Sequence, residues 1–354
     1  IGFILTGCSM QCLLGEENGL AVSGTVLHMV NHSMIKLVLF MAAGCIYMNL
    51  HKLNLNDIRG FGRKKPALGF CFLMGSLGIG GIPLWSGYVS KTLLHESMVE
   101  YAKAVGEGAA VLVNPGMASA SAGMPGIVTS LLLNPGIWKA AEWVFLLTGG
   151  MTVAYMLKLF IALFVEKHPT EQAKYDAMST SCMKPLSRFV LVGCSALIPL
   201  LGMTPHLSMD RIARAGEPFF QGDEMLHSVA YFSLENLKGG VISIGIGVVL
   251  YVLVVRLLLM KKDERGTAIY ADRLPSWLDL ENLVYRPLLL HILPGICGTV
   301  CALIDRYLVS AVVTVFLAVS SVVCRAMDSF VDGLILLARK TTHRQLPGTV
   351  KIRE

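Results

Sequence analysis

The segment from Leu27 to Gly44 reads LHMVNHSMIKLVLFMAAG, and it decides what kind of fold the chain has. It lies inside an apolar run from Leu20 to Asn49, and a helix that spans a bilayer needs about 20 apolar residues. Its ionisable residues His28, His32 and Lys36 are spaced by one helical turn, so on a helix they form one stripe. The segment therefore predicts a membrane helix with a line of titratable groups along one face.

The composition of the whole chain also indicates an integral membrane protein. Of its 354 residues, 54% are hydrophobic before the 35 glycines are counted, and only 15% are charged. An ordinary globular chain has about 25% charged residues, so this chain has too little polar surface for a soluble particle. A soluble catalytic domain, a disordered chain and a nucleic-acid-binding protein are thereby excluded. The net charge of +6 has to be interpreted loop by loop.

The apolar runs predict an all-α fold, a polytopic transmembrane helix bundle with one discontinuous helix. The last run contains Asp305, Arg306 and Tyr307 near its middle. We expect it to form a hairpin of two spans, with an amphipathic helix along the membrane surface as the alternative. The first run has neither an initiator methionine nor a basic signal region, so we interpret the chain as the later portion of a longer protein. The runs are Ile1 to Leu14, Leu20 to Asn49, Pro66 to about Glu96, Trp143 to Val165, Leu186 to Thr204, Gly239 to Met260 and Pro287 to Leu337.

Four parts follow each other along the chain. Residues 1–100 are expected to form a half-bundle with the broken helix, and residues 143–260 three further transmembrane helices. Between them, residues 101–142 contain Asn-Pro-Gly turn signals at Asn114 and Asn134, which indicate an external excursion or a low-complexity linker. Residues 261–354 are expected to form a cytoplasmic linker and the C-terminal hairpin or amphipathic helix. Basic-rich and basic-poor loops alternate, so the positive-inside rule places the chain in the cell membrane, multi-pass, with a cytoplasmic C-terminus.

The stripe on the second helix has two interpretations. Lys36 is too far from the helix end at Asn49 for its stem to reach water, and a charge at the bilayer centre costs at least about 2.5–3.5 kcal/mol. The stripe must then face protein or a water-filled cavity, where lysine and histidine can exchange protons. A proton relay is favoured over a static pairing of Lys36 with an acidic residue. A zinc site at His28 and His32 is disfavoured because the His-Glu-x-x-His pattern is absent.

The third apolar run is interrupted by GIGGIPLWSGYVSK, residues 78–91. Glycine and proline free backbone groups from the helical ladder, which a membrane tolerates only beside protein or water. Lys91 follows this interruption, and two positions are open for it: beside the freed backbone at mid-depth, or snorkelling at the external interface. The residues that predict the discontinuity are Gly80, Gly81, Pro83 and Gly87.

Lys158 and the cysteines complete the inventory of candidate groups. Lys158 lies in the apolar run from Val153 to Val165, where a snorkelling anchor is favoured over a further link in the relay. The nine cysteines lie mostly in apolar runs and suggest neither a metal site nor a cluster. No cofactor-binding motif is found, and no catalytic residue is assigned.

The blocks Leu27 to Gly44, Leu53 to Pro66 and Gly80 to Lys91 together resemble a known superfamily. It comprises the antiporter-like proton-translocating membrane subunits of respiratory complex I, of multisubunit sodium/proton antiporters and of energy-converting hydrogenases. The order and spacing of the blocks agree with this superfamily over about Ile1 to Lys91, and Leu147 to Val165 shows a weaker likeness. The family's first half, with a glutamate and another lysine, has no counterpart in this chain, and the insertion from Tyr101 to Trp138 is longer than expected.

The resemblance implies that Lys36 carries protons at the centre of the path, with His28 and His32 as relay partners and Lys91 as the terminal lysine. The chain would then be a subunit of a redox-driven proton pump of the NADH-quinone oxidoreductase or hydrogenase type. It would have no redox centre of its own, and its partners would be other membrane subunits and the redox subunits that hold the cofactors. The alternatives are a sodium/proton antiporter subunit and a structural membrane scaffold.

Overall fold

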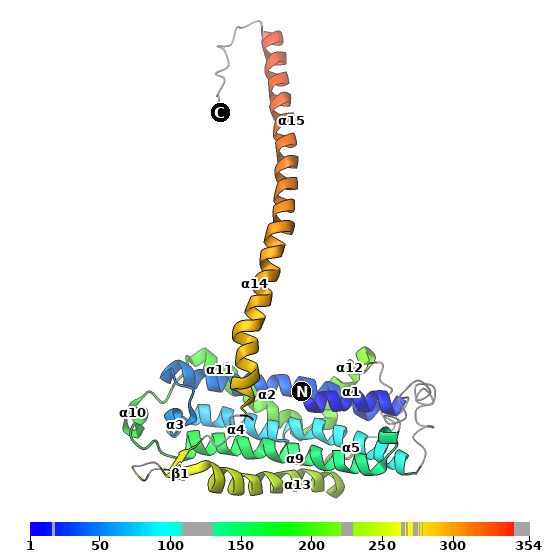
Figure 1. The fold of residues 1–354 in the computed structure, drawn as a ribbon, viewed down its shortest axis with the longest axis vertical. Coiled ribbons are helices and arrows are strands. Elements are labelled where there is room, and N and C mark those ends of the chain that lie inside the picture. Colours follow the sequence, from blue (N-terminus) through cyan, green and yellow to red (C-terminus); the bar gives the residue numbers. More distant parts are fainter. Residues whose placement is uncertain are drawn as a thin grey trace. The chain divides into compact units, whose positions relative to one another are not determined.

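The computed structural model divides the chain into two compact units, Ile1–Asp272 and Arg273–Glu354. The residues that it describes are 1–15, 18–107, 130–220, 229–262, 266, 268–271, 275, 277 and 279–342. Each unit is described by itself. The first unit is a helical bundle with one small strand pair, and the second is a long helical segment (Figure 1).

The first unit consists of long helices that pack along one another. Helix α2 packs against α1, α4 and α5, whereas α9 packs against α4, α5 and α13 (Figure 1). The main helices are α1 (Gly2–Leu14), α2 (Gly19–Leu50), α4 (Pro66–Gly80), α5 (Ser86–Gly106), α9 (Pro135–Phe160) with the π-helical turn η2 (Ile161–Val165), α11 (Pro185–Met203), and α13 (Leu234–Leu250) with η5 (Tyr251–Leu259). Short connecting elements are α3 (Leu55–Ile58), α10 (Gln172–Ala177), η3 (Pro205–Met209), α12 (Asp210–Gly216) and η4 (Glu217–Phe220).

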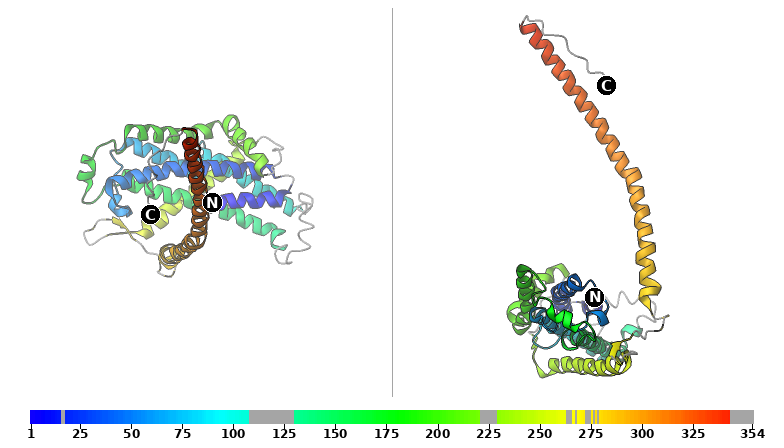
Figure 2. Two further views of the ribbon diagram at one scale, coloured as in Figure 1. Left: turned by 90° about the horizontal axis from the view of Figure 1, so that it is seen from above. Right: turned by 90° about the vertical axis from the view of Figure 1, so that its left-hand side faces the viewer.

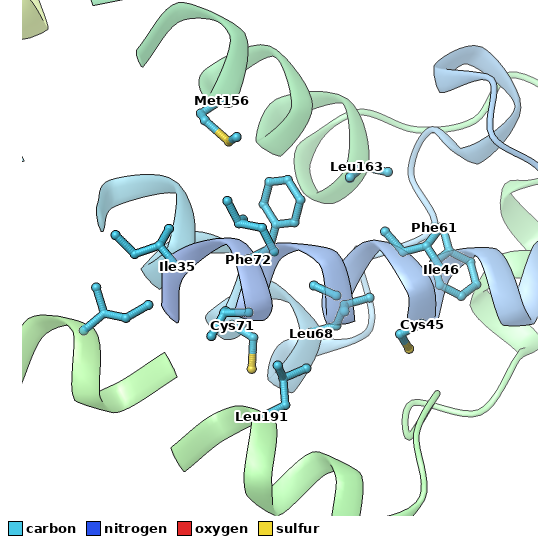
Figure 3. Close-up of a cluster of buried hydrophobic side chains, with 14 of the residues drawn as sticks. Ile35, Cys45, Ile46, Phe61, Leu68, Cys71, Phe72, Met156, Leu163 and Leu191 are labelled. Carbon is cyan, nitrogen blue, oxygen red and sulfur yellow. The ribbon is translucent and has the colours of Figure 1, made fainter. Parts of the chain in front are cut away.

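A hydrophobic core fixes α2 against α4, α9 and α11 (Figure 3). Val38 and Ala42 on α2 and Cys71 on α4 are fully buried in it, and Ile198 of α11 closes one side. Helix α2 is therefore apolar on the face that packs into this core. Its ionisable stripe lies on another part of the helix, and the core holds that stripe in a fixed position.

The basic loops meet at one end of the bundle. There Glu166 forms ion pairs with Arg59 Nε and Arg256 Nη1, each at 2.8 Å, and the hydroxyl of Tyr270 donates a hydrogen bond to it at 3.0 Å. Burial and the nearby Glu166 charge raise the pKa of Tyr270. Strands β1 (Met260–Lys262) and β2 (Ala268–Tyr270) pair antiparallel at this end, with Met260 opposite Tyr270. Loops that lie far apart in sequence are thus joined on one side of the bundle.

Five helices in the described residues are long and apolar enough to cross a membrane. Two shorter apolar helices, α1 and α4, accompany them, so the expected all-α, multi-pass membrane fold is confirmed. By length and composition, the five candidate spans are Gly19–Leu50, Pro135–Val165, Pro185–Met203, Leu234–Leu259 and Glu281–Lys340.

Helices α5 and α9 extend further than the sequence predicted. Helix α5 continues through Tyr101 to Gly106, and α9 begins at Pro135 instead of Trp143. Asn134 caps α9 because its side chain accepts from the backbone N–H of Gly136, and Pro135 occupies the first helical turn. The second Asn-Pro-Gly motif is therefore a helix start. The first, at Asn114, lies outside the described residues.

The second unit forms one continuous helical segment from Glu281 to Thr342, which bends gently along its length (Figure 2). It consists of the π-helical turns η7 (Glu281–Tyr285), η8 (Leu288–Ile292) and η9 (Ile304–Val309), together with α14 (Leu293–Leu303) and α15 (Ser310–Thr342). The expected hairpin at Asp305, Arg306 and Tyr307 is wrong, because these residues are helical. None of them is a glycine or proline that would break the helical ladder.

Candidate functional site

A large cavity in the first unit brings the predicted relay residues together. Its volume is about 910 Å³, and residues of α1, α2, α5 and α9 and the end of α4 line it. His28, His32, Lys36 and Lys91 all contribute to its wall. Other polar lining residues are Thr6, Ser9, Asn31, Thr148, Thr152 and Tyr155. A cavity of this size can hold water molecules, and these need polar partners such as those residues.

The stripe on α2 faces this cavity at mid-helix. Lys36 is about 21 Å from the helix end at Leu50 and about 26 Å from the start at Gly19, at 1.5 Å per residue. Its ammonium lies 5.8 Å from the centroid of the Phe40 ring. One turn before it, His32 is half-buried, and its ring centroid is 6.0 Å from that of His28. The three side chains thus lie at successive turns of the helix on the side that lines the cavity.

His28 connects α2 to α5. It is 7% exposed, and its Nδ1 lies 3.0 Å from Oγ of Ser90, the residue directly before Lys91. Beside it, the side-chain amide of the fully buried Asn31 donates to the backbone carbonyl of Ser86 at 2.8 Å. Two hydrogen bonds from side chains of α2 to α5 therefore fix the distance between the stripe and the helix that carries Lys91.

The broken helix positions Lys91. Helix α4 ends at Gly80 and α5 begins at Ser86, so the carbonyls near the end of α4 lack continuing helical donors. The helical partner of the Ile79 carbonyl would be the N–H of residue 83, which is a proline and has none. Lys91 Nζ donates to that carbonyl at 2.9 Å and to the Gly80 carbonyl at 3.1 Å. The structure therefore has Lys91 beside the freed backbone, half-buried and on the cavity wall.

Glycines permit the close approach of the two half-helices. A Cβ on Gly87 would lie 2.0 Å from the backbone oxygen of Gly78, so only glycine fits there. Gly81 has φ +73° and faces the Lys91 side chain, where a Cβ would lie 2.7 Å from Cδ. Leu84 has φ 77°, which is uncommon for a residue other than glycine. Such a backbone conformation raises the free energy of the folded state, and strained residues of this kind cluster at functional sites.

Lys158 lies apart from the relay residues. It does not line the cavity, and its ammonium lies 5.3 Å from the centroid of the Tyr270 ring, at the basic end of the bundle. This position agrees with an anchoring side chain whose stem is apolar and whose head is polar.

The sequence interpretation gave no role to Asn31, Ser90 or Tyr155, of which Asn31 and Tyr155 line the cavity and Ser90 is hydrogen-bonded to His28. Asn31 and Ser90 occur in the quoted blocks, and each lies next to or one turn from a predicted relay residue. Asn31 and Ser90 could have been identified from the sequence, because each is a polar residue in an apolar run beside a predicted relay residue. Tyr155 comes from α9, far away in sequence, and its place in the wall depends on tertiary packing.

Comparison with known proteins supports the resemblance drawn from the sequence. Residues 1–114 match the family described as NADH:quinone oxidoreductase/Mrp antiporter, TM. The resemblance of this part of the chain to the antiporter-like superfamily is thereby confirmed. The matched region contains all four predicted relay residues, His28, His32, Lys36 and Lys91.

Relatives come from three branches of that superfamily. NAD(P)H-quinone oxidoreductase chain 4 2 of Trichodesmium erythraeum is 31% identical over 94 residues, which are 27% of this chain and 16% of the relative. Formate hydrogenlyase subunit 3 of Escherichia coli is 24% identical over 222 residues, 59% of this chain and 32% of the relative. The putative antiporter subunit mnhD2 of Staphylococcus aureus is 26% identical over 106 residues, 30% of this chain and 20% of the relative. The chain thus spans at most about a third of the length of these relatives.

Proposed function

Because residues 1–114 carry the membrane region of this superfamily, we propose that the chain is a proton-translocating subunit of a redox-driven membrane complex of the NADH-quinone oxidoreductase or hydrogenase type. Protons move along His28, His32, Lys36 and Lys91. The observation that carries the proposal is the 910 Å³ cavity into which these four ionisable groups project at membrane depth. Ionisable residues that lie within membrane helices and face the bundle interior or a water-filled cavity mark proton and ion pathways in membrane proteins.

The geometry supports a relay that passes from α2 to α5. Lys36, His32 and His28 follow one another at intervals of one turn, and His28 reaches α5 through Ser90. Water in the cavity fills the gaps that exceed hydrogen-bonding distance. Lys91 receives the proton at the break, where the carbonyls of Ile79 and Gly80 stabilise its charged form. Its release of that proton toward the far end of the bundle completes one transfer.

The orientation follows from the distribution of charge. The end of the bundle that carries Arg59, Lys65 and Lys184 is cytoplasmic, and protons leave at the other end. We propose a cytoplasmic C-terminus from the basic residues at the end of the sequence, which requires the continuous helix Glu281–Lys340 to lie along the cytoplasmic membrane surface instead of crossing the membrane once. Oxidation of the electron donor takes place in partner subunits that hold the redox cofactors, since the chain has no cofactor-binding motif of its own.

The substitution Lys91→Ala tests the proposal. We expect it to reduce donor-driven proton uptake by inverted membrane vesicles by an order of magnitude or more, because general acid–base groups contribute about 10²–10⁴-fold. Uptake is measured with a fluorescent pH-gradient dye and divided by the amount of assembled complex on native gels. The control is Lys103→Ala, an exposed lysine in the last turn of α5. Wild-type uptake in Lys91→Ala would contradict the proposal, as would loss of assembly alone.

Sodium/proton exchange is the second candidate function, and the likeness to the Staphylococcus aureus antiporter subunit favours it. The two functions differ in the driving reaction. If redox chemistry drives the protein, proton uptake continues in sodium-free buffer and starts when the electron donor is added. If the protein exchanges sodium for protons, a pulse of sodium dissipates an imposed proton gradient although no electron donor is present. The same vesicle preparation and dye measure both responses.

A further inference from the structure

Lys91 lines two cavities, and the second one leads away from the relay. This second cavity has a volume of about 40 Å³ and lies between α5, α9 and α13. Its wall includes Lys91, Asn236 and Ser243 as polar groups and Gly149 and Gly240 as residues without side chains. A space of about 10–15 Å³ with two to four polar partners suffices for one water molecule. Lys91 therefore stands between the large cavity and a smaller polar space.

His95 lies on the far side of the small cavity. It follows Lys91 by one turn of α5 and also lines this space. Its Nε2 lies 3.2 Å from Oε1 of Glu142 on α9, so an imidazole and a carboxylate meet within hydrogen-bonding distance. The side chains are 21% and 35% exposed, respectively. His95 thus lines the cavity, and Glu142, the more exposed of the two, lies between His95 and the surface of the unit.

The pair lies toward the end of the bundle opposite the basic loops. Glu142 is about 10 Å from the start of α9 at Pro135, at 1.5 Å per residue. Helix α5 runs from the break through His95 toward the same end, where it finishes at Gly106. An imidazole suits this place because it can accept a proton on one ring nitrogen and release one from the other. Glu142 lies outside the residues that match the family, 1–114.

We propose that His95 and Glu142 form the exit of the proton path, from Lys91 across the small cavity to the surface. This inference rests on the proposed function and adds the last two carriers to it. Lys91 gives up an N–H proton to a water in the small cavity, and that water protonates the free ring nitrogen of His95. His95 then releases the Nε2 proton to Oε1 of Glu142, and the carboxylic acid loses it to bulk water. One proton crosses and leaves His95 as the Nδ1–H tautomer. His95 recovers its Nε2–H by exchanging ring protons with water, and Lys91 is protonated again from the relay, before the next transfer.

A purely structural role of the pair makes a different prediction. Partly exposed ion pairs contribute little to stability, so a structural pair would tolerate a neutral hydrogen-bonding replacement. Glutamine at position 142 keeps an acceptor oxygen for His95 but takes up no proton. Aspartate keeps the titratable carboxyl group on a shorter stem. Comparison of Glu142→Gln with Glu142→Asp therefore separates proton transfer from packing.

The experiment uses inverted vesicles that contain the whole membrane complex with variants of this chain. Donor-driven proton uptake per assembled complex is expected to fall about tenfold or more in Glu142→Gln and in His95→Gln, and to be largely retained in Glu142→Asp. His206→Gln is the matched control. It removes a histidine 2.9 Å from Asp210 that lines neither cavity, and it should leave uptake unchanged.

Two results would overturn the inference. The first is wild-type uptake in Glu142→Gln, and the second is a loss of assembled complex in that variant with a normal rate per remaining complex. The Lys91→Ala variant, measured in parallel, tells which proposal has failed. If Lys91→Ala stops uptake and Glu142→Gln does not, only the exit is wrong. If neither variant changes uptake, the proposed function itself is wrong.

Discussion

Replacement of Lys36 by methionine is expected to abolish proton translocation while the complex still assembles. Methionine has a stem of similar length but no titratable group, so the row from Lys36 through His32 to His28 loses its first carrier. The change also removes a charge that is expensive to hold at mid-membrane, so it should not weaken the bundle. Donor-driven dye quenching in inverted vesicles, normalised to assembled complex, should fall to the level of an uncoupled sample.

Lys36→Arg is the companion variant that separates charge from proton exchange. Arginine keeps a positive charge at the same place, but its guanidinium does not release a proton in proteins. A relay therefore fails in both variants, whereas a scaffold that needs only the charge would accept arginine. Proton uptake near the wild-type rate in Lys36→Arg would contradict the relay.

The chemical pattern of the site was predictable from the sequence because it is carried by local spacing. The stripe on α2 needs only the helical period, and the break needs only glycine and proline. The sequence allowed two positions for Lys91, beside the freed backbone or at the external interface. A residue's position along a helix does not show which groups of other helices surround its side chain. Folding decides it: Pro83 leaves the Ile79 carbonyl without a donor, and Lys91 donates to it at 2.9 Å.

Contacts between distant helices could not be read in the same way. His95 and Glu142 are 47 positions apart, and neither belongs to a recognisable motif. Their meeting depends on how α5 packs against α9. The start of α9 was misplaced for another reason, since Asn-Pro-Gly serves both as a turn and as a helix N-terminus. The capping bond from the Gly136 N–H to the Asn134 side chain, at 2.9 Å, distinguishes the two.

The long C-terminal segment shows the limit of arguments from charge. Asp305 and Arg306 suggested a hairpin because charges interrupt an apolar run. A change of direction, however, needs residues that end the helix, and helical backbone continues through Tyr307 into α15. Charged side chains by themselves are compatible with a helix whose sides face different surroundings.

Replacement of Gly87 by alanine should disrupt the broken helix and therefore proton transfer. The new Cβ would lie 2.0 Å from the Gly78 backbone oxygen, and backbone cannot move aside as a flexible side chain can. Overpacking of this kind typically costs 1–3 kcal/mol, so α5 must shift away from the end of α4. Lys91 is one turn further along α5, and its ammonium would then leave the carbonyls of Ile79 and Gly80. We expect both a lower melting temperature of the assembled complex and a loss of proton uptake by about tenfold or more.

Gly44→Ala is the matched control for that variant, since it also places alanine in a membrane helix. A Cβ on Gly44 would meet nothing within 4 Å, and alanine is favoured over glycine in a helix by about 1 kcal/mol. Gly44→Ala should therefore assemble and pump at least as well as the wild type. Equal uptake in Gly87→Ala and Gly44→Ala would show that proton transfer does not need the close approach of the two half-helices. The placement of Lys91 at the break would then have no functional consequence, because a displaced ammonium would work as well as one bound to the freed carbonyls.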